Sequence, residues 1–343
     1  MIILGLETSC DETAAAVVQN GEKILSSIVA SSIELHQKTG GIIPEVAARE
    51  QSRFIIPVIK EAMSKAGVKP QDLDGLAVTS GPGLIGSLLV GVETARTLAY
   101  TWQKPLVPIN HLQAHLYANW LGENSAKPKF PALGLVVSGG HTDLILMANH
   151  GEIKWLGGTR DDAAGECFDK CARLLELGYP GGPAISQAAK QFNPKKTTTN
   201  IKLPRPMIKD DNLDFSFSGL KTAVLFEVKK LKEKNQFKKE TINQLAFEIQ
   251  EAIMEVLVTK TKRAAQKYQP SSILLAGGVT ANPRLREEML TRLKEFPVLI
   301  PPFALCTDNA TFVAACANFN FHPIPWSKIQ ADSSLEIEEV IKS

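Results

Sequence analysis

The chain has 343 residues, of which 44% are hydrophobic and 22% are charged, as in an ordinary globular protein. This length exceeds the usual size of one hydrophobic core, so we expect two domains or two lobes of one fold. The 38 Lys and Arg residues nearly balance the 36 Asp and Glu residues, so any nucleic-acid-binding surface must be local.

Secretion and membrane insertion are not indicated. The N-terminus lacks the pattern of a signal or transit peptide, and no apolar segment reaches the roughly 18 to 20 residues of a membrane span. The five cysteines are few and odd in number, which favours reduced thiols over a disulfide framework. We therefore expect a soluble, cytoplasmic protein without a membrane partner.

The first half of the chain alternates predicted strands and helices. Residues 4–22 (LGLETSCDETAAAVVQNGE) read as two apolar strands joined by a small polar turn. Residues 44–66 have apolar residues at helical spacing and Pro44 at an early helical position. Residues 73–79 form a buried strand that leads through a Gly-rich turn into a helix ending near Ala99. Residues 106–109 form another strand, and a helix follows from about Leu112.

An internal repeat links the two halves. Residues 133–152 (LGLVVSGGHTDLILMANHGE) repeat residues 4–22, and aligning Gly5 with Gly134 also aligns Ser9 with Ser138. Hairpins are common, so a chance match is the alternative. Because the agreement runs through both strands and both turns, it favours a duplication, with two lobes of like topology around one cleft.

The second half continues the α/β pattern. Residues 122–130 are a polar connector, residues 241–266 a long helix, and residues 272–276 a strand followed by a helix over 284–293. The helix after Asp308 is expected to return to the first lobe. We therefore predict lobe I over 1–125 and about 306–343, lobe II over 126–305, and a mostly parallel or mixed sheet in each.

A pair of histidines suggests a metal site. His111 and His115 are four residues apart, which places both imidazoles on one face of a helix. Two imidazoles need at least one further ligand, and Asp308 at a strand-to-helix junction is a candidate. The alternatives are histidines that cap or pack at a helix start and an Asp308 that is a helix N-cap. Both interpretations stay open from spacing alone.

Three other segments are candidate ligand contacts. The turn 138–142 (SGGHT) and the strand-to-helix turn 277–282 (GGVTAN) let a phosphate approach backbone N–H groups, although structural turns use the same residues. Residues 161–170 (DDAAGECFDK) open a helix, where Asp161 and Asp162 would satisfy the helix dipole. Asp169, one turn further, could bind ribose hydroxyls.

A basic run follows the segment 214–221 (DFSFSGLK). It comprises Lys229, Lys230, Lys232, Lys234, Lys238 and Lys239, with Lys195, Lys196, Lys202, Arg205 and Lys209 upstream. A charge run on a helix is usually a solvated face. The alternative is a surface that contacts RNA phosphates, whose binding would weaken steeply with salt.

Several motifs in combination resemble those of one family, the TsaD transferases that modify tRNA, once described as O-sialoglycoprotein endopeptidases. The matching segments run in order over about residues 4 to 310: LETSCDET (6–13), GPG (81–83), NHLQAH (110–115), VSGGHT (137–142), DDAAGE (161–166), FDK (168–170), YPGGP (179–183), FSFSGLK (215–221), GGV with Asn282 (277–282) and CTDN (306–309). One departure is Thr311-Phe312-Val313, which we expect to touch no site residue.

The resemblance implies the α/β fold of actin, Hsp70 and sugar kinases (ASKHA), with two duplicated lobes around a nucleotide cleft. It implies one divalent metal ion per subunit, Fe²⁺ or alternatively Zn²⁺, on His111, His115 and Asp308. The contacts it implies to the adenylate substrate are Val136, Val137, Ser138, Gly139, Gly140, Asp169, Gly182, Ser186 and Asn282.

The implied reaction moves a threonylcarbamoyl group from threonylcarbamoyl-AMP to N6 of adenosine 37 in tRNAs reading ANN codons, forming t6A and releasing AMP. The implied partners are a shorter TsaB-like paralogue, which forms a heterodimer, and a TsaE-like P-loop ATPase. No residue is an obvious general base; His141 and a metal-bound water are candidates. The rival interpretations are a metalloprotease, which the missing His-Glu-x-x-His motif disfavours, and a nucleotide-switched binding module.

Overall fold

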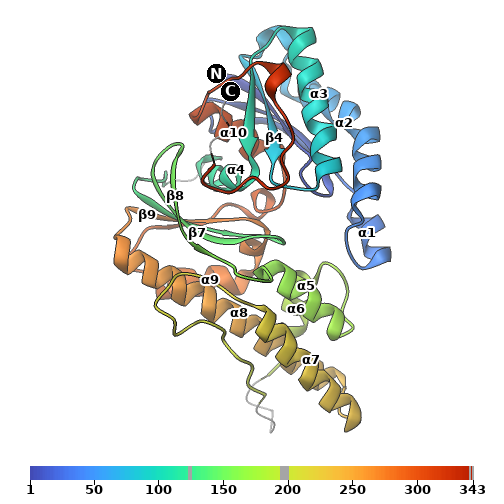
Figure 1. The fold of residues 1–343 in the computed structure, drawn as a ribbon, viewed down its shortest axis with the longest axis vertical. Coiled ribbons are helices and arrows are strands. Elements are labelled where there is room, and N and C mark those ends of the chain that lie inside the picture. Colours follow the sequence, from blue (N-terminus) through green and yellow to red (C-terminus); the bar gives the residue numbers. More distant parts are fainter. Residues whose placement is uncertain (123–125, 194–200, 340, 342–343) are drawn as a thin grey trace. The chain divides into compact units, whose positions relative to one another are not determined.

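Two five-stranded sheets organise the chain, for which a computed structural model describes residues 1–122, 126–193, 201–339 and 341 (Figure 1). Unit 1 comprises Met1–Phe130, Met147–Lys154 and Pro301–Ser343, and unit 2 comprises Pro131–Leu146 and Trp155–Ile300. These bounds place residues 147–154 in unit 1, whereas the predicted lobes placed them in lobe II. Part of the predicted connector, residues 123–125, lies outside the described residues, as do Lys195 and Lys196.

The sheet of unit 1 has the order β3-β2-β1-β4-β5. Its strands are β1 (Ile2–Glu7), β2 (Glu12–Gln19), β3 (Lys23–Ser31), β4 (Gly75–Gly81) and β5 (Leu106–Asn110). Strands β1 and β2 form the predicted antiparallel hairpin, which closes at the pair Glu7 and Ala14. Strand β4 runs parallel to β1 and to β5. The carboxyl ends of these three strands therefore share one edge of the sheet.

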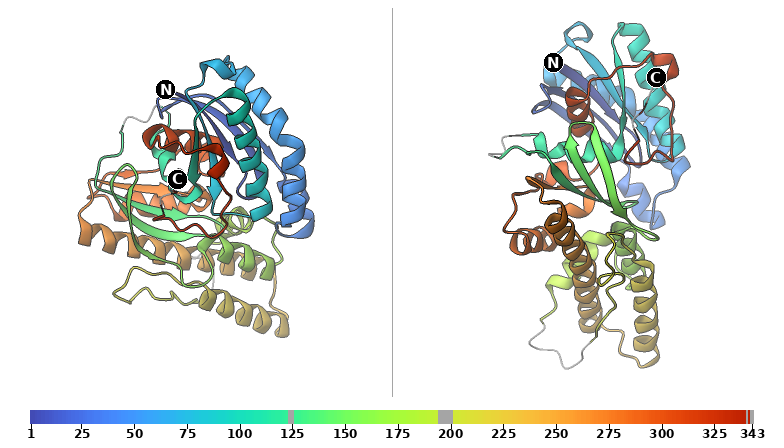
Figure 2. Two further views of the ribbon diagram at one scale, coloured as in Figure 1. Left: turned by 45° about the horizontal axis from the view of Figure 1, so that its top comes forward. Right: turned by 60° about the vertical axis from the view of Figure 1, so that its left-hand side comes forward.

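Helices cover both faces of this sheet (Figures 1 and 2). The α-helices of unit 1 are α1 (Ile33–Thr39), α2 (Pro44–Ala66), α3 (Ile85–Trp102), α4 (His111–Tyr117) and α10 (Ala310–Phe319). Leu4 and Leu6 of β1 belong to the core packed by α2 and α3. Alternate residues point the other way, so Gly5 lies against α10, where a Cβ would come within 2.6 Å of the Ala310 carbonyl oxygen. Glu7 shares that second face.

The sheet of unit 2 has the order β10-β9-β6-β7-β8. Its strands are β6 (Ala132–Val137), β7 (Thr142–Asn149), β8 (Glu152–Gly158), β9 (Ser272–Ala276) and β10 (Val298–Leu299). Its α-helices are α5 (Ala164–Leu174), α6 (Gly181–Lys190), α7 (Ser218–Glu233), α8 (Lys239–Tyr268) and α9 (Pro283–Arg292). These helices and one face of the sheet enclose a single large core.

Short 3₁₀ helices complete the secondary structure. They are η1 (Pro70–Asp72), η2 (Ala118–Trp120), η4 (Gly278–Ala281), η5 (Phe303–Leu305) and η6 (Trp326–Lys328). In the described part of the chain, no helix is both long enough and apolar enough to span a membrane. The five cysteines, all within the described residues, form no disulfide, and four of them are buried.

The strand orders support the predicted duplication. The sheet of unit 1 has the order β3-β2-β1-β4-β5, and the sheet of unit 2, read from its other edge, has the order β8-β7-β6-β9-β10. The first three strands of each sheet are consecutive in the chain, and two later strands follow them. In unit 2, β6 and β9 are parallel, as are β9 and β10, which matches β1, β4 and β5. The predicted α/β class with a mixed sheet in each half is therefore confirmed.

Most predicted elements are present with small shifts in their ends. The structure has β9 at the predicted residues, and α2 begins at Pro44 as expected. The strand expected at 73–79 is β4 over Gly75–Gly81, because Leu73 still belongs to the turn that ends η1. The helix expected after residue 308 begins at Ala310 and belongs to unit 1.

Candidate functional site

The short helix α4 carries both predicted metal ligands. It starts directly after β5, and the side-chain oxygen of Asn110 accepts hydrogen bonds from the backbone N–H groups of Leu112 and Gln113. Asn110 is therefore the N-cap, and the alternative that a histidine caps this helix is wrong. His111 and His115 are 8% and 1% exposed and lie one turn apart on one helix face.

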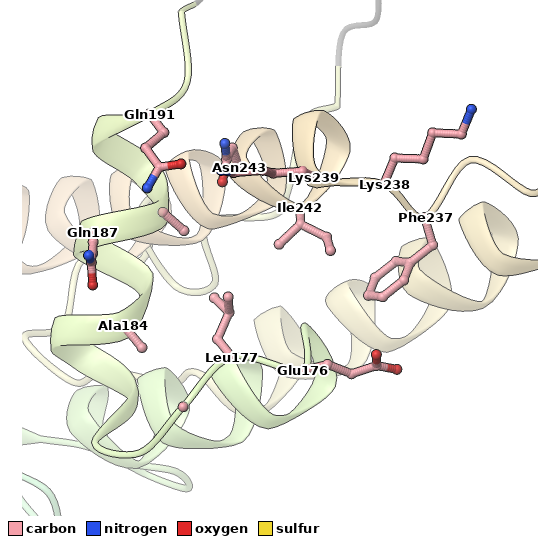
Figure 3. Close-up of a pocket in the computed structure, with 12 residues that line it drawn as sticks. Glu176, Leu177, Ala184, Gln187, Gln191, Phe237, Lys238, Lys239, Ile242 and Asn243 are labelled. Carbon is pink, nitrogen blue, oxygen red and sulfur yellow. The ribbon is translucent and has the colours of Figure 1, made fainter.

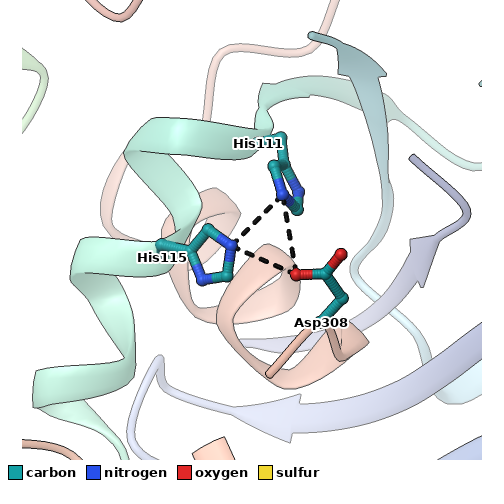
Figure 4. Close-up of side chains that lie close together, drawn as sticks. All are labelled: His111, His115 and Asp308. Atoms are coloured by element: carbon teal, nitrogen blue, oxygen red, sulfur yellow. Dashed lines mark hydrogen bonds and ion pairs between the residues drawn. The ribbon is translucent and has the colours of Figure 1, made fainter. Parts of the chain in front are cut away.

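Three side chains converge beside α4 (Figure 4). The two Nε2 atoms of His111 and His115 are 3.2 Å apart, and Asp308 Oδ1 lies 3.7 Å from the first and 3.3 Å from the second. These three residues form the one cluster of His, Cys, Asp and Glu donors within 4.8 Å of one another among the residues that the structure describes. The spacing prediction is thus matched by the geometry.

Asp308 does not cap the following helix. The side chain of Asn309 accepts from the N–H of Thr311 and is the N-cap of α10. Asp308 is therefore free to point toward the imidazoles, with its side chain 23% exposed. The two alternative roles predicted for Asp308 thus belong to adjacent residues. Asp308 is the candidate metal ligand, and Asn309 is the helix N-cap.

A buried carboxylate orients His111. Glu7 Oε2 lies 2.9 Å from Nδ1 of His111 and accepts a hydrogen bond from the hydroxyl of Thr79, while Glu7 Oε1 accepts from the N–H of Ser9. When His111 is neutral, its Nδ1–H donates to Glu7, so the lone pair is on Nε2, which faces Asp308 and His115. Glu7 stands in the LETS segment, but its role was not predicted. The sequence feature that could have indicated this role is the position of Glu7, since an acidic residue at the end of a buried strand needs a polar partner.

The charges of the cluster shift its titration in the metal-free protein. Burial lowers the pKa of His111, but the carboxylates of Glu7 and Asp308 outweigh it and raise the pKa to about 9. Burial also raises the pKa of Asp308, yet the His111 charge and the His115 hydrogen bond lower it to about 2. Burial and the charge of His111 lower the pKa of His115. At neutral pH, a cation that binds Nε2 of His111 must therefore displace a proton.

The donor set fits a divalent metal ion. Ligand atoms at roughly 2.0 to 2.2 Å from one ion in tetrahedral or octahedral geometry are about 3.0 to 3.5 Å from one another. The three observed separations of 3.2, 3.3 and 3.7 Å lie in or close to that range. Two imidazoles and one carboxylate suit Zn²⁺ and Fe²⁺ alike.

One expectation about this site is wrong. The Thr311-Phe312-Val313 departure was expected to touch no site residue, but the Phe312 ring centroid lies 4.5 Å from that of His115 and 6.2 Å from that of His111. The ring is fully buried. Phe312 therefore supplies apolar packing that fixes the imidazole planes. The signal missed was helical spacing, since Phe312 lies one turn after Asp308.

The loop between β1 and β2 borders the cluster. The Nε2 amide of Gln51, from α2, lies within hydrogen-bond distance of the carbonyls of Thr8, Cys10 and Glu12. Gln51 is 1% exposed, so this amide holds the loop from inside the protein. This contact was not predicted, because a buried Gln in a helical pattern gives no sign of its partner.

The predicted substrate contacts lie in unit 2, where β6 and β9 end. Val136 and Val137 are buried in β6, and Gly139 and Gly140 form an exposed turn. In that turn, the N–H of Ser138 donates to the His141 carbonyl at 2.9 Å, and the N–H of His141 donates to the Ser138 hydroxyl oxygen at 3.1 Å. A Cβ on Gly165 or Gly277 would strike the backbone of Ser138 or Val137, respectively. The turn after β6, the start of α5 and the start of η4 therefore meet at one place in unit 2.

Of the remaining predicted contacts, Asp169 and Asn282 have structural partners of their own. Asp169 Oδ1 accepts a 2.7 Å hydrogen bond from the N–H of Gly181, at the start of α6, and burial raises its pKa. Gly182 has open space where a Cβ would stand, and Ser186 is 9% exposed. Asn282 is the N-cap of α9 and also donates to Gln250. These positions as adenylate contacts stay predictions.

Asp161 has a different role from the predicted one. Helix α5 begins at Ala164, and the Asp161 carboxylate instead accepts hydrogen bonds from the hydroxyls of Ser216 and Ser218 and from the N–H groups of Phe217 and Ser218. It thus caps the start of α7, more than 50 residues away in sequence. Sequence spacing could not reveal this pairing.

Comparison with known proteins identifies the family. Residues 23–315 match TsaD, tRNA N6-adenosine threonylcarbamoyltransferase. The chain is 47% identical to the protein of that name from Thermomicrobium roseum, with 98% of this chain and 95% of that protein covered. It is 48% identical to the one from Geobacillus thermodenitrificans, with 97% and 94% covered. The chain belongs to the TsaD family of transferases. The family resemblance expected from the ordered motifs is confirmed.

Solved structures support the fold. HypF from T. kodakarensis superposes with a TM-score of 0.60 at 12% identity, over 93% of this chain and 47% of that chain. The activator of the 2-hydroxyisocaproyl-CoA dehydratase from Clostridium difficile, solved with bound ADPNP, gives a TM-score of 0.52 at 15% identity, over 94% and 95%. These neighbours agree with the predicted α/β fold of the actin, Hsp70 and sugar-kinase class.

Proposed function

We propose that this TsaD-family chain transfers a threonylcarbamoyl group from threonylcarbamoyl-AMP to N6 of adenosine 37 in tRNAs that read ANN codons. The N6 amine attacks the carbamoyl carbon, a C–N bond forms, and the C–O bond to the phosphate breaks. AMP leaves with the electron pair of that bond, and N6 loses one proton. The observation that carries the proposal is the full-length match to transferases of this name, together with the His111, His115 and Asp308 cluster.

The cluster would hold one divalent ion, Fe²⁺ or Zn²⁺, per subunit. When bound, such an ion supplies a Lewis acid that polarises the threonylcarbamoyl group and orients it. Glu7 keeps His111 in the tautomer with a free Nε2, and Phe312 excludes water from one side of the imidazoles. No described residue is assigned as general base, so positioning is expected to supply most of the acceleration.

The adenylate would be held in unit 2. The exposed Gly139 and Gly140 turn leaves backbone N–H groups accessible to a phosphate, as does the start of α6 near Gly182. The Asp169 carboxylate, which accepts from the N–H of Gly181 at that helix start, would also accept from ribose hydroxyls. Val136, Val137, Ser138, Ser186 and Asn282 complete the proposed contacts. We place this activity in the cytoplasm, together with a TsaB-like paralogue and a TsaE-like P-loop ATPase.

The transfer proposal is tested with purified protein, threonylcarbamoyl-AMP, the partner proteins and unmodified tRNA. Nucleoside analysis should detect t6A and released AMP with the wild type. His115→Ala should abolish transfer yet still bind AMP, and His322→Ala, an exposed histidine of the same unit, should be unaffected. Full transfer by metal-free His111→Ala protein would overturn the role of the cluster, and wild type without t6A would overturn the function.

The corner where α7 leads into α8 is the proposed tRNA contact. Lys229, Lys234, Lys238 and Lys239 are exposed, and none has an ion pair among the described residues. Lys230 and Lys232 pair with Glu227 and Glu176. The four unpaired lysines leave a local positive charge that the chain as a whole, at +2, does not have.

A pocket of about 440 Å³ is lined in part by two of these lysines, Lys238 and Lys239 (Figure 3). Its apolar side chains include Leu177, Phe237 and Ile242, and amide groups come from Gln187, Gln191 and Asn243. Lys238 extends away from the pocket, where a phosphate would meet it (Figure 3). The pocket would accept a ribose or base beside the bound phosphates.

Salt dependence tests this contact. Replacing Lys229, Lys234, Lys238 and Lys239 by Ala should weaken tRNA binding and reduce the slope of log affinity against log salt by about 1 to 3. Turnover at saturating tRNA should not change. The matched control replaces four exposed lysines of unit 1, Lys23, Lys60, Lys69 and Lys328. Equal slopes for the two variants would contradict the contact.

A further inference from the structure

The C-terminal segment of unit 1 crosses the helix that carries the metal ligands. After η6, the chain runs from Ile329, which is 1% exposed, to Ile337, which is 4% exposed. We call residues 332–339 the tail. The N–H of Asp332 donates to the Ser80 carbonyl at 2.7 Å, at the end of β4. The tail therefore starts at the sheet edge where β4 and β5 end.

Asn110 connects the tail to α4. Its Oδ1 caps the helix, and its Nδ2 donates a 2.7 Å hydrogen bond to the backbone carbonyl of Glu336. Asn110 is 4% exposed, so both halves of the amide are satisfied inside the protein. Without the tail, Nδ2 would lose its protein acceptor, which costs free energy for a buried donor.

Two further contacts fix the same crossing. Gln113 Nε2 donates to the carbonyls of Ile337 at 2.8 Å and Glu339 at 3.2 Å. At Gly81, a Cβ would stand 1.8 Å from the Asp332 carbonyl oxygen, so only glycine allows the tail to lie this close. Gly81 is the register partner of Asn110 in the sheet. The tail is thus held both at the end of β4, next to Gly81, and on α4, through Gln113.

Helix α4 needs this support because it is short. Seven residues form about two turns, and a helix of that length has no stability of its own in water. Its first residue, His111, is also a proposed ligand, so any fraying of the first turn moves Nε2 away from Asp308. The hydrogen bonds that stop fraying at that end are those of the Asn110 cap, and the tail holds the cap.

We infer that the tail is a positioning element for the metal site: by holding Asn110 and Gln113, it fixes the first turn of α4 and places His111 opposite His115 and Asp308. The inference rests on the proposed function only in that the cluster binds a metal ion. It assigns a role to residues 332–339, which include none of the three proposed ligands.

The test measures binding of Zn²⁺ and of Co²⁺ by the full-length, metal-depleted protein. Ile337→Ser undocks the tail without changing α4. Asn110→Ser keeps a capping hydroxyl but removes the Nδ2 donor, and it adds no charge. Each should weaken binding about tenfold, as for the loss of an outer-shell contact. Each should also change the visible absorption of the Co²⁺ complex, which reports ligand geometry. Ser333→Ala, an exposed tail residue, is the control.

The outcomes separate this inference from the metal proposal. If the wild type binds one ion and His115→Ala does not, the metal proposal stands. Wild-type affinity and an unchanged Co²⁺ spectrum in both Ile337→Ser and Asn110→Ser would then overturn the tail's role. Hydrogen exchange verifies that Ile337→Ser releases residues 332–339 while β1 and β4 stay protected, so that a fall in affinity is not general unfolding.

Discussion

Glu7 is a charged residue at the end of a buried strand, and its charge has a partner. Burial alone would raise its pKa, but the charge and hydrogen bond of His111 lower it. Replacing Glu7 by Gln removes the negative charge beside His111 and leaves one acceptor oxygen where the carboxylate has two, for His111, Thr79 and Ser9. We expect Glu7→Gln to bind Zn²⁺ about 10 to 100 times more weakly, by competition with a chromophoric chelator at a pH above 9.

The difference in Zn²⁺ affinity between the wild type and Glu7→Gln should depend on pH. In the wild type, His111 has a pKa of about 9, so its apparent metal affinity rises with pH up to that value. Glu7→Gln lowers that pKa, so fewer protons compete with the metal ion for Nε2 of His111. The ratio of the two Zn²⁺ affinities should therefore fall toward pH 7. Thr79→Ser, which keeps the hydroxyl that donates to Glu7, is the control. An affinity ratio that is constant from pH 7 to 9.5 would show that Glu7 does not raise the pKa of His111.

The partly buried side chain of Glu12 destabilises the folded protein when its carboxyl group is ionised. Its Oε2 is buried without a hydrogen-bond partner, and burial, partly offset by the Ser31 hydroxyl, raises its pKa to about 7 from an ordinary 4.5. The unfolded chain ionises first, so stability is lost as the pH rises from about 4.5 to about 7. With chelator present, Glu12→Gln should be about 1 to 3 kcal/mol more stable than wild type at pH 8 and equal to it near pH 4.

Urea unfolding at the two pH values measures this difference. Glu34→Gln, at an exposed position in α1, should show no such change. A Glu12→Gln protein that gains as much at pH 4 as at pH 8 would show that the effect is not ionisation.

Sequence reasoning reached the ligands but not the residues that orient them. His111 and His115 were found because helical spacing is a local property, and Asp308 because it follows a strand. Glu7 and Phe312 reach the cluster only through the tertiary fold. No spacing rule predicts which buried carboxylate a given imidazole will meet.

Among the elements, α7 depends on a residue outside itself. Asp161 accepts four hydrogen bonds at its start, and those from the two serine hydroxyls lower the pKa of Asp161 despite its partial burial. Asp161→Ala should destabilise the protein by about 1 kcal/mol, a typical loss for an N-cap. Exchange should speed up at residues 218–222. Asp161→Asn, which keeps one acceptor oxygen, should lose less; an equal loss would argue against the capping role.

The long, strongly periodic helices were predicted close to their observed bounds, and so was the short strand β9. Helices α2 and α8 carry many turns of apolar periodicity, so their positions followed from sequence. Helix α4 has only seven residues, and β10 only two, so tertiary contacts decide where they end. The tail has almost no regular structure, and its carbonyl groups act through the backbone, where sequence gives no signal.

For the whole molecule, metal removal should affect the two units differently. An ion that binds only the folded state at one hundred times its Kd stabilises that state by about 2.7 kcal/mol. Chelation should therefore lower the unfolding temperature. Hydrogen exchange should increase in α4, α10 and the β1–β2 turn but not in α7 and α8. A uniform increase over both units would contradict a site confined to unit 1.

The path of the chain gives the metal cluster a second consequence. All of unit 2 lies between His111 and Asp308 in the sequence, although the chain returns to unit 1 once within that interval, over Met147–Lys154. An ion on the cluster is thus a reversible cross-link that closes a loop containing all of unit 2. The entropy of closing a loop changes by only about 0.6 kcal/mol for each doubling of its length. The metal site should therefore tolerate insertions in unit 2 at positions away from the proposed adenylate contacts.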